Sequence, residues 1–329
     1  MKLHDIKILK TLHILDTLDK TKSIPRVAHF IVKYSKSKSK FITPNEISKE
    51  NIGDYDYIHA HTAIGAFSLR KYPNIIHHYH GLPLPIFKNK YTIKHYLNEK
   101  LMMNKYSRVV AVSQYLADEV KQKYGREAEA IPNAVDLDSF KPNKIPQKQT
   151  YINHNKLDKK PHFLFVGKLT ERKNAKTLIE SIDIAKSSLP DIRLDIIGTG
   201  VQKDYLEQYT KDQNLTNNVF FHGKVTNERL LELYNSTSFY VTASLWEGFG
   251  MPLVEAMACG KPVLASNIAA HREIINSAKT GYLIENKPEE WAQKMKESLH
   301  TNWERQAYDY AKTQNWSNYV NKLYRKNSL

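Results

Sequence analysis

Residues 245–262 read L-W-E-G-F-G-M-P-L-V-E-A-M-A-C-G-K-P, and the fold of the chain can be worked out from them. The run before them, Phe239 to Ser244, is apolar, β-branched and aromatic, which is typical of a buried strand in a parallel sheet. Pro252 suits the first turn of a helix, and Gly260 suits the position just past its end. We therefore expect a strand, a tight loop and a short helix, followed by a new strand from Pro262 to Ser266.

This loop has the chemistry of an anion site. The helix N-terminus presents unpaired N–H groups, while Gly248 and Gly250 allow a ligand close to the backbone. Two carboxylates flank the site, Glu247 in the loop and Glu255 in the first helical turn. Because acids are poor phosphate ligands, we expect them to bind neutral hydroxyls, as on sugars. The alternative is a solvated loop acid and a helix acid that is stabilised by the dipole.

Composition places the chain among globular proteins. It has 329 residues, 41% hydrophobic and 25% charged, enough for two domains with a substantial core. The single cysteine, Cys259, excludes an internal disulfide and fits a reducing compartment, and its apolar surroundings favour plain packing over a reactive thiol. We see neither a membrane-spanning run nor a signal peptide, so we expect a cytoplasmic protein, soluble or peripheral to the inner face of the membrane.

Charge is distributed unevenly along the chain. The net charge is +15, and residues 1–150 carry 25 Lys and Arg against 14 Asp and Glu, or +11, which leaves +4 for the remainder. The basic stretch 33–40, K-Y-S-K-S-K-S-K, we interpret as a solvated helix end and turn, with attraction to anionic lipid or polymer as the alternative. Residues 91–106 have an apolar stripe of helical spacing, which ordinary core packing explains best, and a basic face that would also suit a membrane surface.

The N-terminal half shows repeated strand and helix units, which imply a parallel sheet covered on both faces. The expected strands are residues 6–14, 57–61, 75–79 and 108–113. A helix should start at Ser23 and Pro25 and run to about Tyr34, and Ser113 could cap the helix after the fourth strand.

Three histidines near residue 80 raise the question of a metal. On a strand His78 and His80 share a face while His77 points away, and no nearby cysteine or acid pair completes a site. We therefore expect no metal here. His80 with Gly81 is of more interest, because ligands bind outside the carboxyl ends of strands in doubly wound sheets.

The C-terminal half starts a fresh α/β unit after a Pro- and Lys-rich segment, 141–160, which resembles a linker. Strands are expected at 163–166, 194–197 and 219–222. The loops after them contain Lys168 and Lys173, the Gly198-Thr199-Gly200 turn, and Gly223-Lys224-Val225. Lysines at a strand-to-helix loop can contact a diphosphate, although solvated lysines are equally common. All these loops should converge with the Glu247 loop on one edge of a sheet.

Three motifs together resemble the family 4 retaining glycosyltransferases, glycosyl transferases group 1. These are F-V-G-K-L-T-E-R-K-N at 165–174, D-I-I-G-T-G at 195–200 and E-G-F-G-M-P-L-V-E-A-M-A-C-G-K-P-V at 247–263. The resemblance covers roughly residues 55 to 329. It implies an α/β protein of the GT-B fold, two Rossmann-like doubly wound domains facing a central cleft. We expect an abbreviated N-terminal domain at 1–150, a donor-binding domain at 151–308, and a C-terminal helix at 309–329 that returns to the first domain.

The resemblance also assigns roles to residues. Lys168 and Lys173 would contact the donor diphosphate, and the backbone of the 248–251 loop would contact phosphate or sugar. Glu255 would bind the ribose and Glu247 the transferred sugar, while His80 would face the reacting sugar. The catalytic set implied is His80, Glu247 and Lys173. The donor-binding set is Lys168, Lys173, Gly198, Gly200, Val225, Glu247, Gly248, Phe249, Gly250, Met251 and Glu255.

The implied activity is transfer of a hexose from a nucleotide sugar with retention of configuration. A UDP-sugar is favoured over a GDP-sugar as the donor. Such enzymes need neither cofactor nor metal, because lysines and helix amides offset the charge of the leaving diphosphate. The acceptor is expected to be anionic or membrane-borne, in cell-envelope polysaccharide, glycolipid or glycoconjugate synthesis, and nucleic acid is not expected to bind. The alternatives are a non-catalytic GT-B protein that binds polyanions or nucleic acid, and a nucleotide-sugar epimerase.

This chain departs from the family pattern in three places. Lys168 stands where arginine is common, so a point charge replaces bidentate phosphate binding. Ala134 stands where glycine is common. The glycine-rich loop usual after the first strand is replaced by residues 15–23, which puts its contribution to donor or acceptor binding in doubt.

Overall fold

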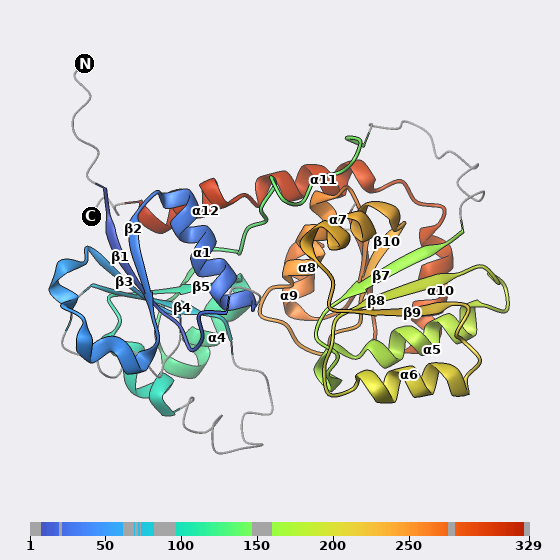
Figure 1. The fold of residues 1–329 in the computed structure, drawn as a ribbon, viewed down its shortest axis with the longest axis horizontal. Coiled ribbons are helices and arrows are strands. Elements are labelled where there is room, and N and C mark those ends of the chain that lie inside the picture. The colour runs from blue at the N-terminus through green and yellow to red at the C-terminus, as the bar shows by residue number, and fades with distance from the viewer. Residues whose placement is uncertain are drawn as a thin grey trace. The chain divides into compact units, whose positions relative to one another are not determined.

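The computed structural model describes residues 8–19, 22–61, 69, 72, 74–81, 97–146, 160–275 and 280–325. The chain forms two compact α/β units (Figure 1). The first unit is Met1–Ala134 with Trp316–Leu329, and the second is Val135–Asn315. Each contains a six-stranded parallel sheet, so the fold class expected from the sequence is confirmed.

The first unit has the strand order β2-β1-β3-β4-β5-β6. Its strands are β1 Lys10–Ile14, β2 Lys38–Ile42, β3 Tyr57–Ala60, β4 Ile75–Tyr79, β5 Arg108–Ala111 and β6 Glu129–Ala130. Its helices are α1 Ser23–Ser35, α4 Gln114–Tyr124 and α12 Trp316–Tyr324, with 3₁₀ turns at Pro44–Lys49, Ile52–Asp54 and Met103–Lys105. As expected, the Ser113 hydroxyl caps α4, accepting the Leu116 N–H at 3.3 Å.

Strand β2 corrects the sequence interpretation. Part of the basic stretch 33–40, taken there as a helix end and turn, begins an edge strand, Lys38–Ile42, paired with β1. Its residues alternate between exposed and half-buried, so the Lys–Ser alternation was the period-2 pattern of a strand. Lysines on the outer face also protect such an edge from pairing with other chains.

The stripe expected within residues 91–106 is only partly a core face. Residues 91–96 lie outside the described residues, and 97–102 are helical. Met102 is buried, but Leu97 and Leu101 are 51% and 63% exposed. Core packing therefore accounts for Met102 and does not account for the two leucines.

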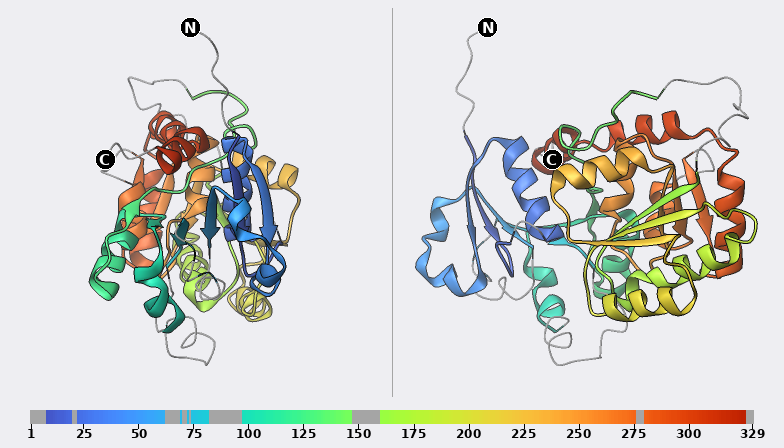
Figure 2. Two further views of the ribbon diagram at one scale, coloured as in Figure 1. Left: turned by 90° about the vertical axis from the view of Figure 1, so that its left-hand side faces the viewer. Right: turned by 45° about the vertical axis from the view of Figure 1, so that its right-hand side comes forward.

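Helix α12 completes the core of the first unit. Trp316 and Tyr319 are buried with Ile31 of α1, Ile76 of β4 and Val110 of β5. In Figures 1 and 2, α12 lies beside α1. The first unit is thus built from two separate segments of the chain. The boundary between the second unit and the returning segment lies after residue 315, whereas the sequence analysis placed it after residue 308.

The other boundary lies at residue 134, where the sequence analysis placed it at 150. The part of the polar segment that the structure describes packs on the second unit: the Asn143 N–H donates to Asn235 Oδ1 at 2.8 Å, and Asn235 Nδ2 donates to the Lys141 carbonyl at 3.1 Å. Side-chain hydrogen bonds of this kind have no pattern in the sequence, which shows only a Pro- and Lys-rich stretch.

The second unit has the strand order β12-β11-β10-β7-β8-β9. Its strands are β7 His162–Val166, β8 Arg193–Ile197, β9 Val219–Gly223, β10 Phe239–Thr242, β11 Val263–Ser266 and β12 Gly281–Ile284. Its helices are α5 Ala175–Ala185, α6 Lys203–Asp212, α7 Asn227–Ser236, α8 Met251–Ala258, α9 Ala269–Ile274, α10 Pro288–Ser298 and α11 Glu304–Thr313, with a 3₁₀ turn, η6, at Glu171–Lys173.

Helices cover both faces of the second sheet (Figures 1 and 2). On one face Phe163 and Phe165 of β7 pack with Leu178 of α5 and Trp291 of α10 in a single apolar core. Helices α7 and α8 cover the other face, and α11 packs on α8. Because parallel strands run in one direction, the loops after β7, β8, β9 and β10 leave the sheet at the same edge.

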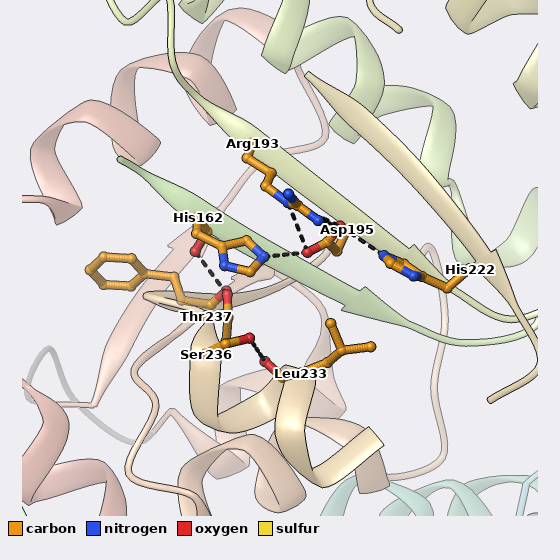
Figure 3. Close-up of polar contacts among 8 residues, drawn as sticks. His162, Arg193, Asp195, His222, Leu233, Ser236 and Thr237 are labelled. Carbon is orange, nitrogen blue, oxygen red and sulfur yellow. Dashed lines mark hydrogen bonds and ion pairs between the residues drawn. The ribbon is translucent and has the colours of Figure 1, made fainter. Parts of the chain in front are cut away.

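A buried ionic cluster joins three strands of this sheet (Figure 3). Asp195 of β8 is fully buried and accepts hydrogen bonds from Arg193 Nη2 at 2.8 Å, from His222 Nε2 at 2.8 Å, and from His162. Burial raises the pKa of Asp195, but the hydrogen bonds from His162, Arg193 and His222 outweigh it and hold the pKa well below its usual value. The cluster connects the neighbouring strands β7, β8 and β9.

Candidate functional site

Backbone hydrogen bonds join three loops of the second unit. The Gly167 N–H donates to the Ile197 carbonyl at 2.9 Å, and the Gly198 N–H donates to the Gly223 carbonyl at 2.8 Å. The Leu169 N–H donates to the Thr199 carbonyl at 2.9 Å. The loops after β7, β8 and β9 therefore form one surface, as the sequence predicted.

Glycine is required where these loops touch. A Cβ on Gly198, whose φ is +135°, would lie 1.9 Å from the Gly167 carbonyl oxygen. A Cβ on Gly200 would lie 2.1 Å from the Leu169 carbonyl oxygen. The G-T-G sequence is thus explained by close contact with the Lys168 loop, whether or not a nucleotide binds there. The nearby Lys168 side chain is exposed, and Val225 is half-buried.

The Glu247 loop joins the same surface. The Leu245 N–H donates to the Arg172 carbonyl at 2.8 Å, which fixes the loop after β10 against η6. Gly250, with φ +113°, is the N-cap of α8, and Pro252 lies in the first turn as expected. Gly248 is half-buried, whereas Phe249 and Met251 are buried, so the side chains of these two residues hold the turn against the protein interior. The first N–H groups of α8 have no partner within the helix, as at any helix start.

Glu247 is a buried carboxylate held in its charged form. Its Oε1 accepts from Lys173 Nζ, and its Oε2 accepts from Arg172 Nη1 at 3.0 Å. Burial raises the pKa of Glu247, but the charges of Lys173 and Arg172 outweigh it and hold the pKa at about 2. At neutral pH, Glu247 can therefore only accept hydrogen bonds.

Arg172 belongs to this site and was missed from the sequence. Its Nη1 also donates to the Trp246 carbonyl at 2.6 Å, and its guanidinium lies 5.7 Å from the Trp246 ring. The signal was present, because the 3₁₀ turn E-R-K carries two adjacent cations. Only the fold shows that both cations meet the same carboxylate.

Glu255 lies one turn further into the protein than the sequence suggested. Helix α8 starts at Met251, so Glu255 is its fifth residue and not in the first turn. The N-cap is Gly250, with a positive φ, so the helix starts directly after it and Glu255 falls in the second turn. Glu255 is buried and accepts a hydrogen bond at 3.2 Å from the buried Tyr234 hydroxyl.

His80 of the first unit is half-buried and lies at the end of a chain of buried histidines. Its Nε2 lies 3.3 Å from His61 Nδ1, and His61 Nε2 lies 3.2 Å from His13 Nδ1. A second pair of histidines lies beside these three rings, with His59 Nδ1 2.8 Å from His78 Nε2. Burial lowers the pKa of His80 and of His59 to about 3, and lowers that of the other three rings well below the usual value. We call these five residues the histidine chain.

His77 points away from this chain, as expected from strand alternation. It contacts Glu99 and stacks on Tyr106, with ring centroids 4.3 Å apart. Across the described residues, no group of three or more histidine, cysteine or acidic side chains is arranged to hold a metal ion. The same part of the chain has no helix that is both long and apolar enough to cross a bilayer.

Two family models match the sequence. Residues 147–315 match the model described as glycosyl transferases group 1, and residues 4–139 match the model described as glycosyltransferase family 4. The first match covers more than half of the chain. The chain belongs to the group 1 glycosyltransferase family.

Curated relatives of this glycosyltransferase match part of their own length. The D-inositol 3-phosphate glycosyltransferase of Paenarthrobacter aurescens is 29% identical over 202 residues, covering 59% of this chain and 49% of that protein. The phosphatidyl-myo-inositol mannosyltransferase of Mycobacterium leprae is 28% identical over 244 residues, covering 70% of this chain and 60% of that protein. The matched region thus spans about half to three fifths of these relatives.

Solved structures share the whole fold of this glycosyltransferase. HepE of Anabaena, solved in complex with UDP and glucose, superposes with a TM-score of 0.76 at 18% identity, over 96% of this chain and 98% of that one. Sucrose-phosphate synthase of Thermosynechococcus elongatus superposes with a TM-score of 0.78 at 16% identity, over 96% and 97%. At these identities the likeness concerns the fold.

A second residue of this glycosyltransferase's second unit also escaped the sequence analysis. His271 of α9 is buried, and a Cβ on Gly250 would lie 3.5 Å from its Cδ2. An isolated histidine in a helix after the last motif gives no signal. Only the pairing of β10 with β11 brings α9 to the Glu247 loop.

Proposed function

We propose that this chain is a retaining glycosyltransferase that transfers a hexose from a nucleotide sugar to an acceptor hydroxyl. The observation that carries the proposal is Glu247, buried and charged beside Lys173 at the start of α8. An ionised acceptor next to helix N–H donors suits a ligand with both hydroxyls and phosphates. A nucleotide sugar has that composition.

In this proposal the diphosphate lies between Lys168 and the first N–H groups of α8, which favour anions. Lys168 is exposed and makes no ion pair with a described residue, so its charge is available to a ligand. Lys173 divides its charge between Glu247 and the leaving phosphate. With two cations and the helix terminus in place, the leaving group needs neither metal nor cofactor.

Glu247 then accepts hydrogen bonds from the hydroxyls of the transferred sugar, and Glu255 binds the ribose. The loops at Gly198–Gly200 and Lys224–Val225 receive the nucleobase. The departing phosphate oxygen takes the proton of the acceptor hydroxyl as the new bond forms on the same face, so configuration is retained. His80 of the first unit supplies the contact to the reacting sugar.

A UDP-sugar is the favoured donor, and the structures of HepE in complex with UDP and glucose and with UDP-glucose support this choice. The excess of basic residues in the N-terminal half supports an anionic or membrane-borne acceptor, such as an envelope polysaccharide or glycolipid precursor. The enzyme would then work in the cytoplasm, peripheral to the inner face of the membrane.

The test is a panel of UDP-glucose, GDP-mannose and ADP-glucose in EDTA, scored by thermal stabilisation and slow donor hydrolysis. One donor should stabilise the protein by several degrees and be hydrolysed. Lys168→Ala should weaken its binding about tenfold without lowering the melting temperature, because Lys168 is exposed. Lys186→Ala is the control, since Lys186 lies at the opposite end of α5, where it pairs with Asp183.

The outcomes separate the alternatives. Release of an epimerised sugar nucleotide in place of nucleotide would favour an epimerase. Salt-sensitive retention on heparin without any nucleotide-sugar binding would favour a polyanion-binding protein. With an acceptor in hand, the anomeric configuration of the first product, read by NMR, decides between retention and inversion.

A further inference from the structure

His271 has one ring nitrogen fixed by the protein. Its Nδ1 lies 3.0 Å from the Ser266 carbonyl oxygen and 3.2 Å from Ser266 Oγ. A carbonyl can only accept, and the Ser266 hydroxyl already donates to the Ser244 carbonyl. Both neighbours of Nδ1 are therefore acceptors, so Nδ1 carries the proton.

The other ring nitrogen, Nε2, is consequently an acceptor when the ring is neutral. Burial lowers the pKa of His271 to about 4, although the charge of Glu247 acts in the opposite direction. The ring is thus neutral at physiological pH. Within the described part of the chain, no protein group hydrogen-bonds to Nε2, so this nitrogen can accept a hydrogen bond from a ligand or from water.

The position of Nε2 identifies the kind of partner it needs. A Cβ on Gly250 would lie 3.7 Å from Nε2, so the nitrogen lies beside the N-cap of α8. The electrostatic influence of Glu247 and Lys173 on the ring places it near that ion pair. A phosphate oxygen cannot satisfy Nε2, because both are acceptors. A hydroxyl can.

We propose that His271 Nε2 accepts a hydrogen bond from a hydroxyl of the transferred sugar and so helps to determine which sugar is used. This rests on the proposed function, because it requires a nucleotide sugar at the α8 N-terminus. Glu247 and His271 then form a pair of acceptors, one charged and one neutral, that select a sugar by the placement of two hydroxyls. The nucleotide makes no contact with His271.

The first experiment uses the wild-type protein with ¹⁵N-labelled histidine. Without ligand, the His271 ring should show the Nδ1-protonated neutral form. The nucleotide sugar selected from UDP-glucose, GDP-mannose and ADP-glucose should shift the Nε2 resonance, and its nucleoside diphosphate alone should leave it unchanged. Equal shifts with both ligands, or none with either bound, would overturn the proposal.

The second experiment replaces the acceptor. His271→Phe keeps a planar ring without the nitrogen and should raise KM for the nucleotide sugar about tenfold, while inhibition by the nucleoside diphosphate is unchanged. His271→Gln, which can offer an amide oxygen, should recover part of the loss. Melting temperatures check that each variant folds.

Monodeoxy donors identify the hydroxyl. The analogue that lacks the bound hydroxyl should react poorly with the wild type, and His271→Phe should cost nothing further with it. If every deoxy donor still loses tenfold on substitution, His271 acts only by packing and the proposal is wrong. If the wild type binds no nucleotide sugar at all, the proposed function fails first and this inference fails with it.

Discussion

The two units bury polar side chains in opposite ways. In the first unit, the five rings of the histidine chain hydrogen-bond to one another and to the hydroxyls of Thr11, Tyr319 and Tyr324, and burial keeps them neutral. In the second unit, Glu247 keeps its charge because Lys173 and Arg172 lie against it. An imidazole can donate from one nitrogen and accept at the other, whereas a carboxylate can only accept.

This difference determines which change destabilises each unit: protonation of a buried ring or loss of a paired cation. A neutral hydrogen-bonded chain is stable until one ring takes up a proton, because no carboxylate lies in the chain to balance the new charge. A paired charge is stable until its partner is removed. The comparison therefore predicts that low pH destabilises the first unit and that removal of a cation destabilises the second.

The largest effect should come from pH. His59 and His80 have pKa values of about 3 in the folded protein against 6.5 when unfolded, so the unfolded state takes up more protons below pH 6.5. Each costs about 1.4 kcal/mol per pH unit below that value, or about 4 kcal/mol together at pH 5, and the other three rings add to this. Hydrogen exchange, corrected for intrinsic rates, should show peptides of β1, β3 and β4, which carry the histidine chain, losing protection first.

The second unit should resist this acidification. The stabilising contribution of Glu247, whose pKa is lowered from 4.5 to about 2, is complete above pH 4.5 and is lost only as the pH falls toward 2. Among the described residues of this unit, burial lowers the pKa of His271 to about 4. The prediction is wrong if, as the pH falls, β8 and β10 lose hydrogen-exchange protection at the same pH as β4 or at a higher pH.

The next effect tests whether the units are independent. Trp316→Ala removes the largest side chain that α12 contributes to the first core and should cost about 3–5 kcal/mol there. Trp291→Ala is the matched change in the core of the second unit. Each should lower hydrogen-exchange protection in its own unit only, and equal losses in both units would show a single cooperative structure.

A smaller effect follows from removing one cation of the Glu247 site. Lys173→Met leaves the buried carboxylate with Arg172 alone, and the loss should be about 2 kcal/mol because one partner remains. The pKa of Glu247 should rise, which carboxyl ¹³C NMR can follow. An unchanged melting temperature would mean that solvent replaces Lys173 without cost. Lys186→Met, at the opposite end of α5, again serves as the control.

The smallest effect concerns the end of the histidine chain. The Tyr324 hydroxyl lies 2.9 Å from His59 Nε2, and Tyr324→Phe should cost about 1 kcal/mol by urea unfolding of the first unit. Tyr282→Phe, whose ring packs on Trp303 in the second unit, is the control and should be close to neutral. A neutral Tyr324→Phe would show that the chain contributes little to stability.

Local patterns in the sequence predicted most of the fold. Strand β4 was placed at its observed bounds, Ile75–Tyr79, and the strand, loop and helix around Glu247 were found because proline and glycine mark helix ends. Strand β2 was missed because its lysines hid a period of two, and β12 was not predicted at all.

Contacts between distant residues could not be predicted. His13, His61 and His80 become neighbours only because β1, β3 and β4 are adjacent, and a sequence does not state strand order. Arg172 and His271 reach Glu247 by the same kind of contact. The motifs indicated where a ligand approaches the backbone, but the partners of each charged group depend on the packed fold.

The return of α12 to the first unit has a consequence for synthesis. The second unit, Val135–Asn315, is one uninterrupted piece of chain and can fold as soon as it leaves the ribosome. The first unit is made earlier, yet its core waits for Trp316 and the residues after it. The second unit can therefore complete its core before the first unit does, and Ile31, Ile76 and Val110 lack their cover until Trp316 has been made.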